Sequence, residues 1–291
     1  MSANMSSGKF YCYNYFMLKL GAHLSISGGY YKALENINSK GGNCLQIFSA
    51  SPRAWNFARP SDNDINDFIK TKSKLKIDPV YFHASYLINL ALNNRVGQLS
   101  KQLLKHELKL AAKLGVKGSI VHLGSFKEVK NIYVDIISQI KEILTDTPEN
   151  TLFMIENAGN NKIGQEMKEI ATIVKEVDSP RLKVCLDTCH LYSAGYDLST
   201  SQKLETFLKE FDSLIDLEKL ELFHSNDSKD PFNSGRDRHE NIGKGTIPIE
   251  TFQLIMTHPK LKHLPFIIEV PGFNDEGPDK KNLDILKNLL P

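Results

Sequence analysis

The sequence predicts a single α/β domain, a (β/α)8 TIM barrel, on three observations. Eight short apolar runs alternate with eight stretches in which apolar residues have helical spacing. No low-complexity linker or change of composition divides the 291 residues, and that length fits one such barrel. We therefore expect a barrel domain over residues 17–291. Residues 1–16 are expected to be an irregular N-terminal extension, with Met17 as an alternative start.

Strands are predicted where β-branched, aromatic and aliphatic residues run together between turn residues. The eight predicted strands are Leu18–His23, Cys44–Phe48, Pro79–His83, Ser119–His122, Thr151–Glu156, Lys183–Leu186, Leu220–His224 and Pro265–Val270. Because a helix separates each strand from the next, the pattern predicts parallel pairing with right-handed crossovers, which closes into a barrel.

Helices are predicted where apolar residues recur every three or four positions. The eight predicted helices are Tyr31–Asn38, Asp62–Lys74, Val96–Leu114, Ile132–Leu144, Gln165–Val177, Lys203–Asp212, Ile249–Met256 and Lys281–Leu289. In the third of them Leu99, Leu103, Leu110 and Leu114 share one face, and Gly115 is placed to end the helix. The segment between the seventh strand and residue 249 is expected to be a long polar loop.

Composition and charge exclude several classes of protein. No apolar run approaches the roughly 20 residues that cross a bilayer, and the N-terminal MSANMSSGKFYCYNYFM resembles neither a signal nor a transit peptide. Four scattered cysteines, Cys185 and Cys189 among them, indicate free thiols in a reducing, cytoplasmic compartment. The net charge of +2 indicates no broad basic face. A monomer is expected.

Potential metal ligands stand at the C-terminal ends of six consecutive predicted strands, from the third to the eighth. Active sites of this fold lie at that end of the barrel. The six residues are His83, His122, Glu156, Asp187, His224 and Glu269. His190 follows the sixth strand, and Asp237 and His239 lie in the long polar loop. One such residue alone would as readily be a helix cap or a surface residue, but six in a row predict a metal site at the C-terminal face.

These nine side chains offer imidazole nitrogens and carboxylate oxygens, the donors that suit catalytic Zn²⁺ or Mn²⁺. Since carboxylates can bridge, nine donors are enough for about three ions at three or four protein ligands each. Neighbouring ions can activate a water molecule and stabilise the attacking and leaving oxygens of a phosphodiester. His23 is predicted to orient a ligand instead of binding a metal.

Metal ions would also change the charge of the barrel mouth. Three Zn²⁺ would add about six positive charges at one face. The loops predicted around that face carry Arg53, Lys162, Lys229, Arg236, Arg238 and Lys244. A polyanion would be attracted to this face although the chain as a whole is nearly neutral.

Seven motifs follow one another along the chain: GAHLSISGG, HASYLINL, IENAG, CLDTCH, HSND, DRHENIGKG and IIEV. Together they closely resemble the endonuclease IV family of apurinic/apyrimidinic (AP) endonucleases. The resemblance covers residues 18–270. CLDTCH with the downstream DRH is its most specific part, and all nine ligand positions of the family pattern are occupied.

The resemblance implies a trinuclear zinc hydrolase of base excision DNA repair. The implied ligand groups are His83 and His122 with the bridging Glu156; Glu156, Asp187, His224 and Glu269; and His190, Asp237 and His239. Glu156 would also position the hydroxide that attacks the phosphate 5′ to an abasic site, which leaves a 3′-hydroxyl. Removal of 3′-blocking groups is a further implied activity, and Mn²⁺ in place of one Zn²⁺ is left open.

The implied partner is double-stranded DNA with abasic or 3′-blocked lesions. Family members bend the duplex and insert loop side chains, and Arg53, Tyr86 and Leu87 match those positions. Their chemistry fits, since a cation suits the groove and an aromatic and an aliphatic side chain suit unstacked bases. Two departures are Leu123, where the family usually has proline, and the shortened loop NAGNNKIG. Neither removes a predicted ligand.

Two other functions use the same scaffold. A metal-dependent sugar isomerase or epimerase needs only a set such as Glu156, Asp187, His224 and Glu269, so the five further ligands favour the nuclease. A non-catalytic DNA-damage binder would be expected to lose ligands first, and here the set is intact. The fold alone does not decide among the three functions.

Overall fold

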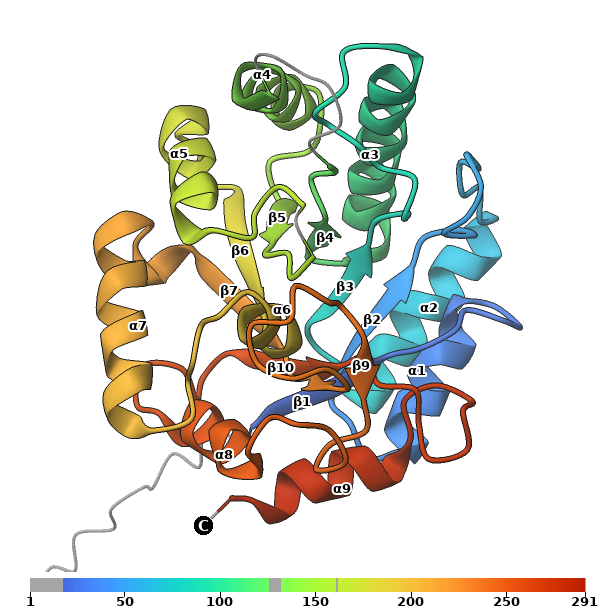
Figure 1. Cartoon of the computed structure of the whole chain (residues 1–291). Helices are drawn as coiled ribbons and strands as arrows, with labels where there is room; N and C mark the ends of the chain where they lie inside the picture. Colours follow the sequence, from blue (N-terminus) through green and yellow to red (C-terminus); the bar gives the residue numbers. More distant parts are fainter. Residues whose placement is uncertain (1–17, 126–131, 161, 291) are drawn as a thin grey trace, which may run out of the picture.

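The computed structural model describes residues 18–125, 132–160 and 162–290, and these residues form a closed barrel of eight parallel strands (Figure 1). The barrel strands are β1 (Lys19–His23), β2 (Cys44–Phe48), β3 (Val80–His83), β4 (Gly118–Val121), β5 (Leu152–Glu156), β6 (Leu182–Asp187), β7 (Leu220–His224) and β10 (Pro265–Ile268). The ring closes because β1 pairs with both β2 and β10. The predicted (β/α)8 barrel is confirmed.

The helices form the outer ring around these strands (Figure 1). They are α1 (Tyr30–Ser39), α2 (Asp62–Leu75), α3 (Arg95–Leu114), α4 (Ile132–Thr145), α5 (Met167–Val177), α7 (Ser201–Leu214), α8 (Ile249–Thr257) and α9 (Lys280–Asn288). Their ends lie within about two residues of the predicted ends, which is the ordinary uncertainty of helix boundaries. Among the described residues, no helix is both long and apolar enough to cross a membrane. The predicted extension over residues 1–16 lies outside the described residues.

The structure adds short elements that the sequence pattern did not predict. Helix α6 (Thr188–Ser193) follows β6 directly, and the carboxylate of Asp187 caps it by accepting the backbone N–H of His190 at 3.0 Å. The loop predicted as wholly polar contains an antiparallel pair, β8 (Asp227–Ser228) with β9 (His239–Glu240). A short 3-10 turn, η1 (Leu217–Lys219), precedes β7. Elements this short are below the length at which periodicity can be recognised.

The core has two parts. A large apolar layer fills the space between the strands and the surrounding helices. A second cluster fills the barrel interior and takes one buried residue from each of seven strands: Cys44, Tyr81, Ile120, Met154, Cys185, Leu222 and Ile267. On β1 the equivalent position is Gly21, where a Cβ atom would lie 2.0 Å from the carbonyl oxygen of Cys44. The barrel interior is therefore filled by a packed apolar layer, which we call the apolar floor, as is usual for this fold. The site lies directly above this layer.

The carboxylate of Asp227 fixes the loop that follows β9. Its two oxygens accept the backbone N–H groups of Ser228, Gly243, Gly245 and Ile247 at 2.8, 2.9, 2.9 and 3.1 Å. Asp227 is fully buried. A Cβ atom on Gly245 would lie 2.3 Å from the carbonyl oxygen of Ser228, so the loop passes too close for any larger residue.

Replacing Asp227 with alanine should therefore lower the free energy of unfolding by about 3 kcal/mol or more, because an unsatisfied buried donor costs about 1–3 kcal/mol. Urea unfolding of the metal-free chain measures this loss. Asp230→Ala is the matched control, since that carboxylate lies in the same loop but binds the half-exposed guanidinium of Arg238. It should lose much less stability, and equal losses in the two variants would contradict the role given to Asp227.

Candidate metal centre

A ring of polar side chains lies directly above the apolar floor of the barrel. Side chains alternate between the two faces of a strand, so the residue two positions beyond each floor residue also points into the barrel. These residues, one for each strand, are His23, Gln46, His83, His122, Glu156, Asp187, His224 and Glu269. The six predicted strand-end ligands are thus brought together at the C-terminal mouth, with His23 and Gln46 completing the ring.

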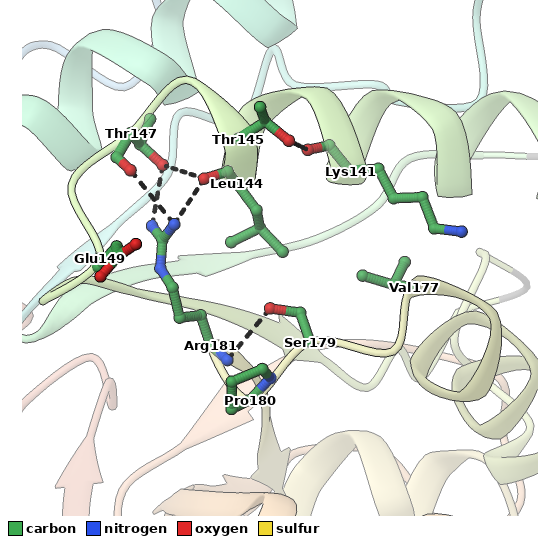
Figure 2. A pocket seen from close by; sticks show the side chains of 9 residues that line it. All are labelled: Lys141, Leu144, Thr145, Thr147, Glu149, Val177, Ser179, Pro180 and Arg181. Carbon is green, nitrogen blue, oxygen red and sulfur yellow. Dashed lines mark hydrogen bonds between the residues drawn. The ribbon is translucent and has the colours of Figure 1, made fainter.

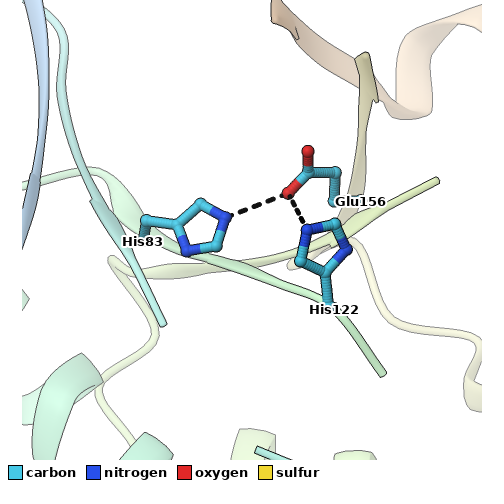
Figure 3. A group of neighbouring side chains, drawn as sticks. All are labelled: His83, His122 and Glu156. Atoms are coloured by element: carbon cyan, nitrogen blue, oxygen red, sulfur yellow. Dashed lines mark hydrogen bonds and ion pairs between the residues drawn. The ribbon is translucent and has the colours of Figure 1, made fainter. Parts of the chain in front are cut away.

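Glu156 lies at the centre of the first group. Its Oε2 atom is 3.0 Å from Nε2 of His83 and 3.2 Å from Nε2 of His122 (Figure 3). The donor atoms of these three residues lie within 4.8 Å of one another. Glu156 is fully buried at the end of β5. The group therefore has the ligand types and the spacing for one metal ion.

The second group uses the other oxygen of the same carboxylate. Nδ1 of His224 lies 2.9 Å from Oε1 of Glu156, 3.4 Å from Oε2 of Glu269 and 3.8 Å from Oδ2 of Asp187. These four residues form a second set whose donor atoms lie within 4.8 Å of one another. Because its two oxygens face different groups, Glu156 has the geometry of a bridging carboxylate.

The third predicted group is centred on Asp237. Its Oδ1 atom lies 2.9 Å from Nε2 of His190 and 3.5 Å from Nε2 of His239. The structure brings two further donors close: Asp187 groups with His190 and His239, and Cys189 groups with Asp237 and His239. Burial raises the pKa of the Cys189 thiol, which disfavours the thiolate that binds metals.

The hydrogen bonds of the histidines indicate that the residues fit metal ions. His83 donates its Nδ1 hydrogen to the carbonyl oxygen of Ala84 at 2.8 Å, and His224 donates its Nε2 hydrogen to Oε1 of Gln46 at 2.7 Å. When the ring is neutral, its remaining nitrogen carries a lone pair that faces an oxygen of Glu156, at 3.0 Å for His83 and 2.9 Å for His224. Two lone pairs at this distance repel each other, so the position is occupied by a proton, which Glu156 favours by raising the pKa of His83, or by a metal ion.

The same pattern occurs in the third group. His190 donates its Nδ1 hydrogen to the carbonyl oxygen of Asn157 at 2.9 Å, so in the neutral ring the Nε2 lone pair faces Asp237. Nε2 of His239 is buried and has no hydrogen-bond partner among the described residues, although carboxylate oxygens of Asp187 and Asp237 each lie 3.5 Å away. An orphaned imidazole nitrogen between two carboxylates has the chemistry of a metal ligand.

The negative charges of the carboxylates in the site also favour the binding of cations. In the part of the chain that the structure describes, the partners of Glu156, Asp187, Asp237 and Glu269 in ion pairs are histidines, with no lysine or arginine among them. Burial would raise the pKa of Glu156, but the imidazoles around it hold that pKa well below its usual range. Burial lowers the pKa of His122 to about 4, which keeps this ring neutral and able to bind a metal.

His23 lies beside the second group. Its Nδ1 atom is 3.1 Å from Oε1 of Glu269, and the residue belongs to none of the four donor groups found in the described chain. The role predicted for it, orienting a ligand, stays a prediction.

Among the described residues, three buried amide side chains hydrogen-bond to the candidate ligands or to their backbone, and sequence reasoning missed all three. Asn226 donates to Asp187 Oδ2 at 2.6 Å and accepts the backbone N–H of Glu269 at 2.7 Å. Asn157 accepts the backbone N–H of Asp187 at 2.6 Å. The third is Gln46 on β2. The available signals were an amide one residue after Glu156 in IENAG, an amide two residues after His224 in HSND, and one polar residue inside the apolar run CLQIF.

The loops with the predicted DNA contacts lie next to the candidate metal ligands. The backbone N–H of Tyr86 and the hydroxyl of Ser85 both donate to the carbonyl oxygen of Pro52, at 3.2 and 2.7 Å, which ties the two loops together. Arg53 is exposed, Leu87 is half-buried, and Tyr86 is 63% exposed although it is a large aromatic residue. Its ring centroid lies 6.4 Å from that of His83.

Of the cations predicted around the mouth, the guanidinium of Arg238 is not free. It forms a paired contact with the carboxylate of Asp230, and Nη1 of Arg236 lies 3.6 Å from the same carboxylate. Lys229 and Lys244 are exposed. Asp230 therefore offsets part of the positive charge expected from this loop.

A cavity of about 390 Å³ opens above the ring. Ligands from all three groups line it, together with Phe48, Tyr86 and Pro278. A larger cavity, about 780 Å³, lies near the N-terminal ends of β5 and β6, away from the ring, and Figure 2 shows the residues that line it, Arg181 among them. There the guanidinium of Arg181 is taken up by the carbonyl oxygens of Leu144 and Thr147 and by neighbouring hydroxyls. The volume of a cavity alone would therefore not identify the cavity beside the candidate metal ligands.

The comparisons with known proteins agree with this geometry. A family model described as xylose isomerase-like TIM barrel matches residues 34–289. "Probable endonuclease 4" of Thermosipho africanus (strain TCF52B) is 39% identical over 284 residues, which cover 94% of this chain and 99% of that protein. "Probable endonuclease 4" of Thermotoga maritima is 34% identical over 283 residues, covering 94% and 98%.

Solved structures add a close neighbour and several distant ones. The crystal structure of endonuclease IV from Thermus thermophilus superposes with a TM-score of 0.82 at 30% identity, covering 93% of this chain and 98% of that chain. A D-tagatose 3-epimerase-like protein superposes with a TM-score of 0.71 at 21% identity, which shows the shared fold alone.

The fold and the ring of histidines and carboxylates thus define a xylose isomerase-like TIM barrel protein with a candidate metal centre. Within this class, the chain belongs to the endonuclease IV family. The resemblance inferred from the seven motifs is confirmed, and with it the assignment of the chain as a hydrolytic enzyme, a nuclease.

Proposed function

We propose that this chain is a zinc-dependent DNA-repair endonuclease that hydrolyses the phosphodiester 5′ to abasic sites and leaves a 3′-hydroxyl. Removal of 3′-blocking groups at the same site is part of the proposal. The observation that carries it is the bridging geometry of Glu156, whose two oxygens face two separate groups of donors. Two groups that share one carboxylate suit a pair of adjacent metal ions, which is the arrangement used for phosphodiester hydrolysis.

The residues divide into three proposed zinc sites, as the resemblance implied: His83 and His122 with Glu156; Glu156, Asp187, His224 and Glu269; and His190, Asp237 and His239. Bound zinc would activate water and stabilise the charge that develops on the phosphate oxygens. Glu156 would hold the first two sites at a fixed separation and position the attacking hydroxide. Mn²⁺ in place of one Zn²⁺ is compatible with the same donors.

For DNA recognition we propose that the joined loops of Arg53 and Tyr86 enter the duplex at the lesion. An exposed tyrosine beside the cavity above the ring suits stacking on a base left without its partner, and Leu87 offers an aliphatic wedge. Arg53 is exposed and can contact phosphate or the groove. The abasic nucleotide would then turn into the cavity above the ring.

A duplex with a single tetrahydrofuran abasic analogue tests the function directly. This analogue cannot undergo β-elimination, so a cut reports hydrolysis. We expect a cut 5′ to the analogue with a 3′-hydroxyl, identified by mass spectrometry of the fragments, and no cut in the same duplex with an intact thymidine. Tight binding without a cut would favour the damage binder, and neither binding nor cutting would favour a sugar isomerase or epimerase.

Replacing Tyr86 with alanine should weaken binding of the abasic duplex by about 5- to 150-fold, since stacking of one base on an aromatic ring contributes about 1–3 kcal/mol. The rate at saturating DNA should stay near that of the wild type, because Tyr86 is not a metal ligand in the proposal. Fluorescence anisotropy measures the affinity. Val134→Ala on α4 is the control, as its side chain is also exposed, at 67%, but lies on the outer ring of helices. Unchanged affinity in Tyr86→Ala would rule out the wedge.

The proposal includes a cytoplasmic monomer. Cys44, Cys185 and Cys189 are buried free thiols, which suits a reducing compartment, and Cys12 lies outside the described residues. Light scattering coupled to size-exclusion chromatography tests the monomer.

A further inference from the structure

Gln46 occupies on β2 the position that metal ligands occupy on the strands from β3 onward. It lies two residues beyond Cys44, a member of the apolar floor, just as His83 lies two residues beyond Tyr81. The side chain is fully buried. A lone amide in the apolar run of a barrel strand loses hydration, so its hydrogen bonds must be satisfied inside the protein.

The Gln46 amide makes its hydrogen bonds with side chains of the candidate metal centre and of the neighbouring His23. Its Oε1 atom accepts the Nε2 hydrogen of His224 at 2.7 Å. Its Nε2 atom donates to Oε1 of Glu269 at 2.6 Å and lies 2.8 Å from Nδ1 of His23. The opposite orientation of the amide would place its oxygen against the carboxylate of Glu269, which is electrostatically unfavourable.

These contacts determine which atom of His224 and which atom of Glu269 is left to face a metal ion. When Nε2 of His224 carries the hydrogen, Nδ1 keeps its lone pair, and Nδ1 is the atom that faces Glu156, Asp187 and Glu269. When the amide holds Oε1 of Glu269, Oε2 is left on the side of His224, 3.4 Å from Nδ1. One side chain thus selects the metal-facing atom of both ligands.

We infer that Gln46 is a positioning residue that sets the tautomer of His224 and the orientation of Glu269 for the second metal site. The inference rests on the proposed function, since it assigns these two residues to a metal ion. The candidate metal ligands begin at the third strand, β3. At the equivalent positions of β1 and β2, His23 and Gln46 instead support ligands that lie on β7 and after β10. Partners that hold the non-coordinating atoms of metal ligands commonly change metal affinity by about 10–100-fold.

Two variants separate the two contacts. Gln46→Met keeps the volume and removes both contacts, whereas Gln46→Glu keeps an acceptor for His224 and replaces the donor to Glu269 with a like charge. Gln139→Met is the matched control, because Gln139 is another buried glutamine, and its amide donates to the carbonyl oxygens of Leu90 and Leu92 away from the ring.

The first measurement is the tautomer of the neutral His224 ring in the metal-free chain, read from the ¹⁵N chemical shifts of labelled histidine rings at a pH above the raised pKa of this residue. The His224 signals are assigned by their loss in His224→Gln. We expect the hydrogen on Nε2 in the wild type, in Gln46→Glu and in Gln139→Met, and a mixture of tautomers in Gln46→Met. A hydrogen on Nδ1 in the wild-type chain would overturn the inference without any variant.

The second measurement is the rate of zinc release to a chromophoric chelator from the zinc-loaded chain. We expect release to be faster by about 10–100-fold in both Gln46 variants and unchanged in Gln139→Met. Release within twofold of the wild type in Gln46→Met and Gln46→Glu would overturn the inference. Neither readout uses DNA, so failure of the wild type to cut abasic DNA would count against the proposed function alone.

Discussion

Replacing Glu156 with glutamine is expected to abolish cleavage of abasic DNA, with a loss of about 10³-fold or more, equivalent to about 4 kcal/mol of barrier. The change keeps the size of the side chain but removes the negative charge that faces His83 and His122 through one oxygen and His224 through the other. An amide would place an N–H group against one of these imidazole sets and cannot bridge two cations. DNA affinity should change little, because the basic and aromatic groups at the mouth are untouched.

Single-turnover cleavage of the tetrahydrofuran duplex and anisotropy on the same duplex measure the two effects separately. Glu205→Gln is the matched control, since Oε1 of Glu205 also lies 3.0 Å from a histidine, Nε2 of His258, but on the outer helices. That variant should cut at the wild-type rate. Wild-type cutting by Glu156→Gln would show that the metal assignment is wrong.

Removal of metal should abolish activity and also destabilise the chain. Without cations, Glu156, Asp187, Asp237 and Glu269 are left close together inside the barrel, and within the described part of the chain only imidazoles offset their charge. A ligand present at about 1,000 times its dissociation constant stabilises the folded state by about 4 kcal/mol. For a chain of this size, that corresponds to a fall in melting temperature of about 5–10 °C when the metal is stripped.

Elemental analysis and differential scanning calorimetry, before and after dialysis against a chelator, measure both effects. We expect about three zinc ions for each chain and full recovery when zinc is returned. Mg²⁺ is the control cation, because it prefers six oxygen ligands and should restore little. Glu156→Gln should show a smaller metal-dependent rise in melting temperature. Undiminished cleavage in the chelator would refute the metal-dependent mechanism.

The fold and the inner ring of donors were predictable because both follow from short-range rules. Apolar runs four to six residues long, spaced by helices, are typical of barrel strands, and the parallel strands place their C-terminal ends at one mouth. His83, Glu156 and Asp187 could therefore be assigned to a common site from their positions at strand ends. The third group was harder, since His190 lies on α6 and His239 on β9, two elements too short to predict.

The supporting amides could not be found in the same way. Gln46 and His224 are 178 residues apart, and Gln46 stands inside a strand, two residues before its end. No spacing rule links such residues, because their contact depends on how many strands close the barrel. The pairing of Asp230 with Arg238 was missed for a related reason: charge counting from sequence does not show which cations are neutralised by a neighbour.

The sequence by itself determined the class of fold, the family and the residues that can bind metal, because hydrophobic periodicity and the types of side chain at strand ends are local properties. Only the tertiary structure decided which oxygen of Glu156 faces which histidine, which ring nitrogen of His224 faces Gln46, and that His23 on β1 and Gln46 on β2 lie beside the candidate ligands. These features depend on angles and distances of a few ångströms between strands far apart in the chain, and the closure of the barrel sets them.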